Sequence, residues 1–174
     1  MSNIDRLWAP WRVKYIRECS SAKSKTKKSP CIFCSAIKDP VNKFVVAQNK
    51  TAFAVLNIYP YNNGHLMVAP RRHAPDIGVL DEEECLDLFK MLNYMRDTLK
   101  KVLNPEGFNI GINEGRVSGA GIPGHLHMHI VPRWKGDTNF MPVTSSTKVV
   151  SQSLQELLTI LKDAKAKRVK GSRR

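Results

Sequence analysis

Three of the five histidines in this chain of 174 residues occupy alternate positions, at His125, His127 and His129. Apolar residues fill the places between and after them, namely Leu126, Met128 and Ile130. Alternate side chains of a β-strand face opposite sides, so the apolar residues would face a core and the imidazoles would line the other side. Each imidazole is a potential base, nucleophile or metal ligand. The alternative is a solvent-exposed polar strand face, which the scarcity of histidine elsewhere in the chain disfavours.

A glycine-rich loop, residues 114–124, leads directly into these histidines. Glycines let backbone N–H groups converge on one point, as in anion-binding nests, although an ordinary flexible connection has the same composition. Beside a row of imidazoles, the loop favours a phosphate held where a histidine attacks it. His127 has an imidazole on either side and is the best-placed nucleophile, attacking phosphorus as a neutral ring to form a phosphoramidate. We therefore expect a backbone carbonyl to fix the His127 tautomer, and His129 to bind a phosphate oxygen or protonate the leaving group.

Cys31 and Cys34 are the closely spaced pair among the four cysteines. In a cytosolic chain such a pair indicates metal or redox chemistry more than a structural disulfide. A tetrahedral structural zinc needs two more ligands, and the candidates are His73 and one histidine of the row. The alternative is a reduced pair without metal. We expect zinc.

Two further polar residues have an ordinary alternative to a functional role. His65 follows a turn-rich loop and starts a predicted strand, where it either supports the histidine row or is a core histidine with its hydrogen bonds satisfied. Asn57 would reach a ribose hydroxyl, but asparagine at a strand end is more often a turn former.

The elements that position these residues are predicted from the spacing of apolar side chains. Four strands are expected at residues 44–47, 51–56, 65–69 and 107–113, and the histidine row supplies the fifth. Five strands that mostly alternate buried and exposed residues, with two principal helices, predict an antiparallel sheet covered on one face.

The longer of the two principal helices is predicted to begin after Asp81, with Glu84 completing a capping box, and to end near Asn104. The last helix is expected from about Ser151. A short helical turn is expected at residues 35–38.

The formal net charge of +13 comes from both ends of the chain, because residues 30–161 are nearly neutral. We expect residues 1–29 to be an N-terminal extension with a basic linker, residues 30–161 a catalytic domain, and residues 162–174 a basic tail. The apolar segment around Trp8 and Trp11 is expected to pack on the domain or on a partner subunit. Basic tails attract polyanions without specificity, so no specific nucleic-acid partner is expected.

No apolar run reaches membrane-spanning length, and the first residues lack the apolar core of a secretory signal. We therefore expect a cytoplasmic protein without a membrane partner.

The segment from His125 to Val131 resembles the signature of the histidine triad superfamily, in which single apolar residues separate three histidines and two more follow. Other segments are similar to one branch, the microbial diadenosine tetraphosphate phosphorylases; they are residues 7–12, 31–34, 64–66, 132–134 and 139–142. The resemblance extends from about Asp5 to about Leu161.

The resemblance implies an α+β histidine-triad fold with a five-stranded antiparallel sheet and two principal helices, usually in a homodimer. It implies cleavage of dinucleoside polyphosphates through a covalent nucleotidyl-histidine intermediate, with phosphorolysis favoured over hydrolysis. The alternatives are a nucleoside phosphoramidate hydrolase, and a nucleotide-binding protein whose catalysis is vestigial. A protein that processes nucleic-acid ends is a further alternative, which the nearly neutral body of the chain disfavours.

The resemblance also implies a role for each matching residue. The nucleophile falls on His127, with His129 beside it, and the nucleotide ribose contact falls on Asn57. The phosphates would be held by Asn113 and the loop residues Gly119, Ala120 and Gly121. Zinc would be bound by Cys31, Cys34, His73 and His125. Many relatives carry Gln or Ser in the loop before the triad, whereas residues 119–124 of this chain offer no such side chain, so backbone amides must contribute more.

Overall fold

A computed structural model describes residues 31–41, 43–138 and 149–171 of the chain. The expected extension at residues 1–29, with Trp8 and Trp11, lies outside the described residues, as does the segment 139–142. The described elements, in chain order, are α2 (Ile32–Lys38), β1 (Val45–Gln48), β2 (Ala52–Leu56), β3 (Leu66–Pro70), the 3-10 turn η1 (Ile77–Val79), α3 (Glu82–Leu103), β4 (Gly107–Ile112), β5 (Met128–Arg133) and α5 (Leu154–Gly171).

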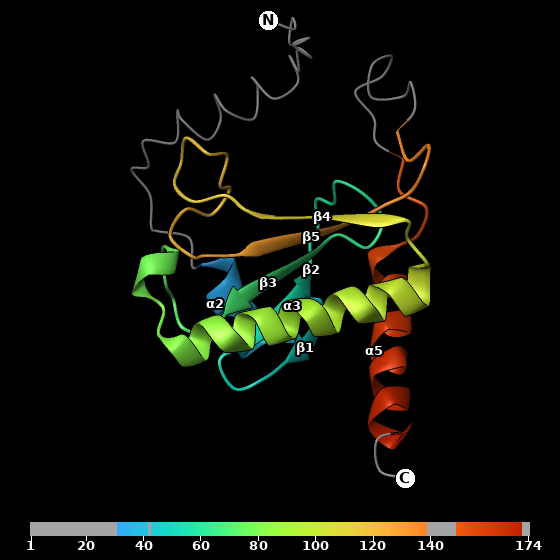
Figure 1. Cartoon of the computed structure of the whole chain (residues 1–174), viewed down its shortest axis with the longest axis horizontal. Helices are drawn as coiled ribbons and strands as arrows, with labels where there is room; N and C mark the ends of the chain where they lie inside the picture. Colours follow the sequence, from blue (N-terminus) through green and yellow to red (C-terminus); the bar gives the residue numbers. More distant parts are fainter. Residues whose placement is uncertain (1–30, 42, 139–148, 172–174) are drawn as a thin grey trace, which may run out of the picture.

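The five strands form one antiparallel sheet in the order β1-β2-β3-β5-β4. The histidine strand β5 therefore lies inside the sheet, between β3 and β4, while β4 is an edge strand. The helix α3 crosses the face of the sheet (Figure 1). The predicted α+β fold with five antiparallel strands is confirmed.

The helix α3 begins and ends where the sequence predicts. The Asp81 carboxylate accepts from the backbone N–H of Glu84, and the Glu84 carboxylate accepts from the backbone N–H of Asp81, which completes the capping box. Asn104 ends the helix in the left-handed conformation, with φ of 45°. One stripe of α3 faces the sheet, and its buried apolar members are Leu88, Met91, Leu92, Met95 and Leu99.

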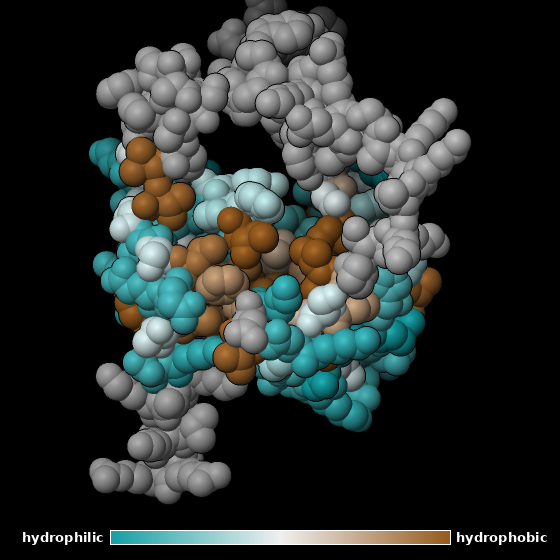
Figure 2. Space-filling model, turned by 180° about the vertical axis from the view of Figure 1, so that it is seen from behind, coloured by the Kyte–Doolittle hydropathy of each residue, from teal (hydrophilic) through white to brown (hydrophobic). Residues whose placement is uncertain are grey.

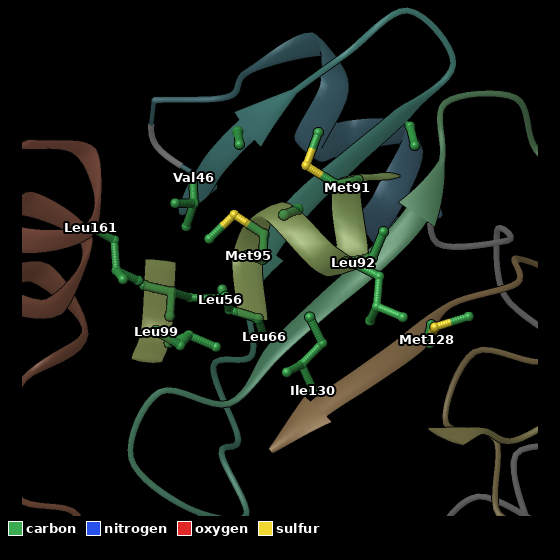
Figure 3. Packing of buried hydrophobic residues seen from close by; sticks show 14 of the residues in the cluster. Val46, Leu56, Leu66, Met91, Leu92, Met95, Leu99, Met128, Ile130 and Leu161 are labelled. Carbon is green, nitrogen blue, oxygen red and sulfur yellow. The ribbon is translucent and has the colours of Figure 1, made fainter. Parts of the chain in front are cut away.

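The main core lies between the sheet, α3 and α5 (Figure 3). Leu126, Met128 and Ile130, the apolar residues that alternate with the histidines, all belong to it, so the predicted period of two is confirmed. Leu161 of α5 is fully buried there. The helix α5 begins at Leu154, three residues after the predicted start, and continues past Leu161 to Gly171.

The two principal helices cover one face of the sheet, as expected, but a second apolar cluster lies on the opposite face, where the short helix α2 packs. The short helix α2 contributes Phe33 and Ala36, which pack on Phe53, Val55 and sheet neighbours. The rings of Phe33 and Phe53 meet edge to face at 6.2 Å between centroids. Seen from behind, the molecule displays hydrophobic residues at the centre of its surface (Figure 2).

Among the described residues, no helix combines the length and the apolar character that crossing a bilayer requires.

Candidate active site and metal cluster

The three histidines of the row lie on one face of the sheet, beneath α2. The strand β5 begins at Met128, so His125 and His127 approach the sheet just before it and His129 lies within it. His125 and His127 are buried, and the Phe33 ring of α2 lies 5.1 and 4.9 Å from their ring centroids. The alternative of a solvent-exposed polar strand face is therefore wrong.

A backbone carbonyl fixes the tautomer of His127, as the sequence analysis expects. Nδ1 of His127 lies 2.9 Å from the carbonyl oxygen of His125, so it carries the proton and donates. Nε2 is then left with a free lone pair. Burial holds the pKa of His127 below its usual value, opposed in part by this hydrogen bond. His127 therefore has the protonation state that an attacking imidazole needs at neutral pH.

A chain of hydrogen bonds fixes His129 in the opposite tautomer. The backbone N–H of Tyr61 donates to Nδ1 of His65 over 3.0 Å, so the proton of His65 lies on Nε2. That Nε2 lies 2.8 Å from Nδ1 of His129, which must accept. The proton of His129 is therefore on Nε2, where it is available to a ligand. Of the two predicted alternatives for His65, its position favours support for the histidine row.

Both rings of this pair stay neutral well below pH 7. Burial, with smaller contributions from His129 and His127, lowers the pKa of His65 to about 3. Burial, followed by the nearby His127, lowers the pKa of His129 to about 4. His129 thus offers an N–H donor without a positive charge.

Asn57 lies beside the same network, at the end of β2. Its Nδ2 is 3.3 Å from Nδ1 of His65, and its Oδ1 accepts from the backbone N–H of Tyr59 over 2.9 Å. Asn57 therefore acts as a turn former next to the histidines, and a contact with ribose stays a prediction.

The four residues predicted to bind zinc lie together at the other end of the histidine row. Sγ of Cys31 is 3.3 Å from Nδ1 of His125, and Sγ of Cys34 is 3.7 Å from that nitrogen and 3.4 Å from Nδ1 of His73. All four ligand atoms lie within 4.8 Å of one another. A tetrahedral zinc bound to two thiolates and two imidazoles separates its ligand atoms by about 3.4–3.8 Å. The donor set and its spacing fit that ion.

One hydrogen bond fixes the tautomer of His125 in this cluster, and an ion pair lies beside His73 in the sequence. Nε2 of His125 donates to the carbonyl oxygen of Pro70 over 2.9 Å, which leaves Nδ1 free for a metal. Arg72, next to His73, forms hydrogen bonds of 2.8 and 2.6 Å with both oxygens of the buried Glu84 at the start of α3. This pairing holds the pKa of the Glu84 carboxyl below its usual value.

The loop that would hold phosphates is largely exposed. Gly119 has a φ of +91°, and its N–H donates within the loop to the carbonyl oxygen of Arg116 over 3.3 Å. Gly121 is exposed, while Ala120 and Asn113 are partly buried. The phosphate contacts of these residues stay predictions.

Sequence reasoning did not identify Tyr61 or the pair of Arg72 and Glu84. Tyr61 precedes His65 by four residues, and its ring centroid lies 4.6 Å from that of His65 and 5.9 Å from that of His129. The turn-rich composition of residues 57–64 predicts a loop, but it does not indicate which side chain of the loop packs on the histidines.

Comparisons with known proteins show which family this chain resembles. A family model described as HIT domain matches residues 39–136. The chain is 36% identical over 162 residues to AP-4-A phosphorylase of Mycobacterium tuberculosis, covering 91% of this chain and 83% of that protein. It is 36% identical over 100 residues to bis(5'-nucleosyl)-tetraphosphatase [asymmetrical] of Schizosaccharomyces pombe, covering 58% of this chain and 54% of that one.

Among solved structures, the fold is similar to that of a Zn-bound histidine triad family protein from Mycobacterium smegmatis. The TM-score is 0.67, with 22% sequence identity over 82% of this chain and 97% of that one.

Proposed function

The chain belongs to the HIT domain family, and on that basis we propose that it cleaves dinucleoside polyphosphates by nucleotidyl transfer through His127. The observation that carries the proposal is the 2.9 Å hydrogen bond from Nδ1 of His127 to the carbonyl of His125, because it leaves Nε2 unprotonated. The proposal agrees with the activity named for the mycobacterial relative.

In the first step, Nε2 of His127 attacks the phosphorus next to one nucleoside. An N–P bond forms, and the bond from that phosphorus to the bridging oxygen breaks, so the rest of the polyphosphate leaves. The Nε2–H of His129, fixed by His65, donates a hydrogen bond to a phosphate oxygen as charge develops there. Asn57 binds the ribose, and Asn113, Gly119, Ala120 and Gly121 hold the phosphates.

In the second step, an oxygen of inorganic phosphate attacks the same phosphorus and the N–P bond breaks. The released product is a nucleoside diphosphate, and His127 returns to its starting state. Water in place of phosphate would release a nucleoside monophosphate, as the name of the fission-yeast relative implies for that protein. We favour phosphate because the mycobacterial relative matches over most of both chains.

Incubation with diadenosine tetraphosphate, with and without phosphate, tests this function. Phosphorolysis yields ADP and ATP only when phosphate is present, whereas hydrolysis yields AMP and ATP without it. A rapidly quenched reaction should contain adenylylated protein, and the adduct should be absent from His127→Ala. Full turnover with no adduct on His127 would falsify the covalent route.

We also propose that Cys31, Cys34, His73 and His125 hold one structural zinc ion. The spacing of their four ligand atoms supports this assignment. The ion would tie α2 to the segment after β3 and to the start of the triad, which are far apart in the sequence. It would supply cross-linking rather than chemistry, since four protein ligands leave no open position.

A homodimer is the expected assembly, and β4 is the surface that we propose for it. This edge strand has six residues and no charge, and Ile110 in its middle is 43% exposed. Such an edge offers unpaired backbone groups to another strand. The cytoplasmic location and the absence of a specific nucleic-acid partner stay predictions.

A further inference from the structure

A shallow depression lies next to His129, on the side away from the cysteine–histidine cluster. Its lining includes Tyr61, Asn62, Asn109, Val131, Arg133 and Asp137. Alternate residues of β5 share one face and are spaced about 6.8 Å apart. Val131 and Arg133 therefore continue the line of His127 and His129, and the depression begins one side chain beyond His129.

No side chain of β4 separates His129 from this depression. Gly111 pairs with His129, and Asn109 pairs with Val131. Residues directly opposite each other in an antiparallel pair have their side chains on the same face. A Cβ added at Gly111 would meet nothing within 4 Å. No side chain of β4 thus stands between the histidine and the depression.

Tyr61 forms the wall of the depression nearest to the histidines. Its ring packs on the imidazoles of His65 and His129, in nearly parallel orientation to the latter, with 24° between the planes. The residue is nevertheless 59% exposed. An exposed aromatic ring beside a reaction centre offers a stacking surface for a nucleobase, whichever base it is.

The positive charge of Arg133 in the depression is balanced by the carboxylate of Asp137. Arg133 binds both carboxylate oxygens of Asp137, at 2.6 and 2.9 Å, and the Asp137 side chain is 7% exposed. Nη1 of Arg133 donates to Oδ1 of Asn109, and the Asn109 amide nitrogen donates no hydrogen bond within the described part of the chain. Among the described residues this hollow is therefore neutral and offers the amide nitrogen of Asn109 as a donor, which suits an uncharged nucleoside better than a phosphate.

We propose that this depression binds the second nucleoside of the dinucleotide, the half that leaves with the polyphosphate. Its base stacks on Tyr61 and accepts a hydrogen bond from Asn109. The inference rests on the proposed nucleotidyl transfer by His127. It explains why the substrate would carry two nucleosides, because a mononucleotide reaches the same His127 and leaves the depression empty.

Equilibrium binding of two ligands to the full chain tests the site. AMP probes the first nucleoside position alone. A diadenosine tetraphosphate analogue with methylene groups in place of the α–β bridging oxygens probes both positions without being cleaved. The variants are Tyr61→Ala and Asn109→Ala, from different elements. Tyr61→Phe keeps the ring, and Tyr59→Ala removes an aromatic side chain that is 80% exposed and is absent from the depression.

Loss of base stacking typically weakens binding by about fivefold to a hundredfold. We expect Tyr61→Ala and Asn109→Ala to weaken binding of the dinucleotide analogue by at least about fivefold. Both should change AMP binding by less than about twofold. Tyr59→Ala should bind both ligands like the unaltered protein. Tyr61→Phe, which keeps the stacking ring, should lose much less affinity for the dinucleotide analogue than Tyr61→Ala does. Equal weakening of both ligands, or no change in either, overturns the second-nucleoside site. Failure of the unaltered protein to bind even AMP would instead overturn the proposed function itself.

Discussion

Nε2 of His65 lies 2.8 Å from Nδ1 of His129, and this one contact determines which nitrogen of His129 carries the proton. His65 obtains its own tautomer from the backbone of Tyr61. The backbone N–H of Tyr61 thereby determines, through His65, that Nε2 of His129 is a hydrogen-bond donor.

Replacing His65 should slow catalysis without abolishing it. His65→Phe removes the donor to His129, which then loses its fixed tautomer, and we expect kcat to fall about tenfold to a hundredfold. His65→Gln keeps an N–H donor near the position of Nε2, so its kcat should fall less than that of His65→Phe. Steady-state kinetics with diadenosine tetraphosphate provide the measurement, and an unchanged kcat in His65→Phe would contradict the role.

Stability should decrease in acid because His65 and His129 are buried as neutral rings. Their pKa values are lowered to about 3 and about 4, from an ordinary 6.5. Between pH 6.5 and 4 the unfolded chain binds more protons than the folded one, so the free energy of unfolding rises with pH. This stability is fully present above pH 6.5 and is lost as the pH falls through the folded values.

Chemical denaturation of the zinc-loaded protein between pH 4 and 7 measures this effect. His129→Asn should show a shallower pH dependence than the unaltered chain, since one buried ring is gone. Parallel curves of unfolding free energy against pH for the two proteins would contradict a buried, neutral His129.

Loss of the proposed zinc site should destabilise the whole domain. Cys31→Ser removes a thiolate ligand, and we expect the zinc content to fall well below one ion per chain. The melting temperature should fall by about 4–8 °C, corresponding to a loss of about 2 kcal/mol. Cys85→Ser is the matched control, because Cys85 is a free cysteine outside the cluster. Equal zinc content in both variants would argue against the site.

Gly64 should tolerate no side chain. Its φ is +78°, and a Cβ there would lie 2.6 Å from Cδ1 of Leu103 and 3.0 Å from Cγ of Pro132. Gly64→Ala should therefore lower the free energy of unfolding by about 2–4 kcal/mol. Gly107→Ala, where a Cβ meets nothing within 4 Å, should change it by less than about 1 kcal/mol. Similar values for the two variants, measured by urea denaturation, would contradict the steric argument.

A charge in the middle of β4 should separate the proposed dimer. Ile110→Lys places an ammonium group on the edge strand, where it repels its copy and needs water. Sedimentation velocity should show the unaltered chain as a dimer and Ile110→Lys as a monomer with the same far-ultraviolet circular dichroism. A monomer in both cases rejects the dimer.

Local patterns in the sequence were sufficient for the strands, for the capping box of α3 and for the buried side of the histidine row. Each of these depends on neighbours within a few residues, so periodicity and capping chemistry determine it. The carbonyl that orients His127 was also predictable, because it comes from His125 two residues away.

The second covered face was not predictable in the same way. The helix α2 has seven residues, too few for a clear apolar period, and Phe33 lies between two cysteines that invite a metal interpretation. The contact of Arg72 with Glu84 depends on how a loop returns to a helix, which no local pattern encodes. The choice of His125 as the metal ligand came from the family resemblance, and the geometry agrees with it.

His125 gives its ring to the cysteine cluster and its carbonyl to His127, so a single residue belongs to both centres. An oxidant of the thiols, or a chelator that removes the proposed zinc, would therefore disturb the orientation of the attacking imidazole without entering the nucleotide site. Turnover of dinucleotides would then report the redox and metal status of the surrounding solution.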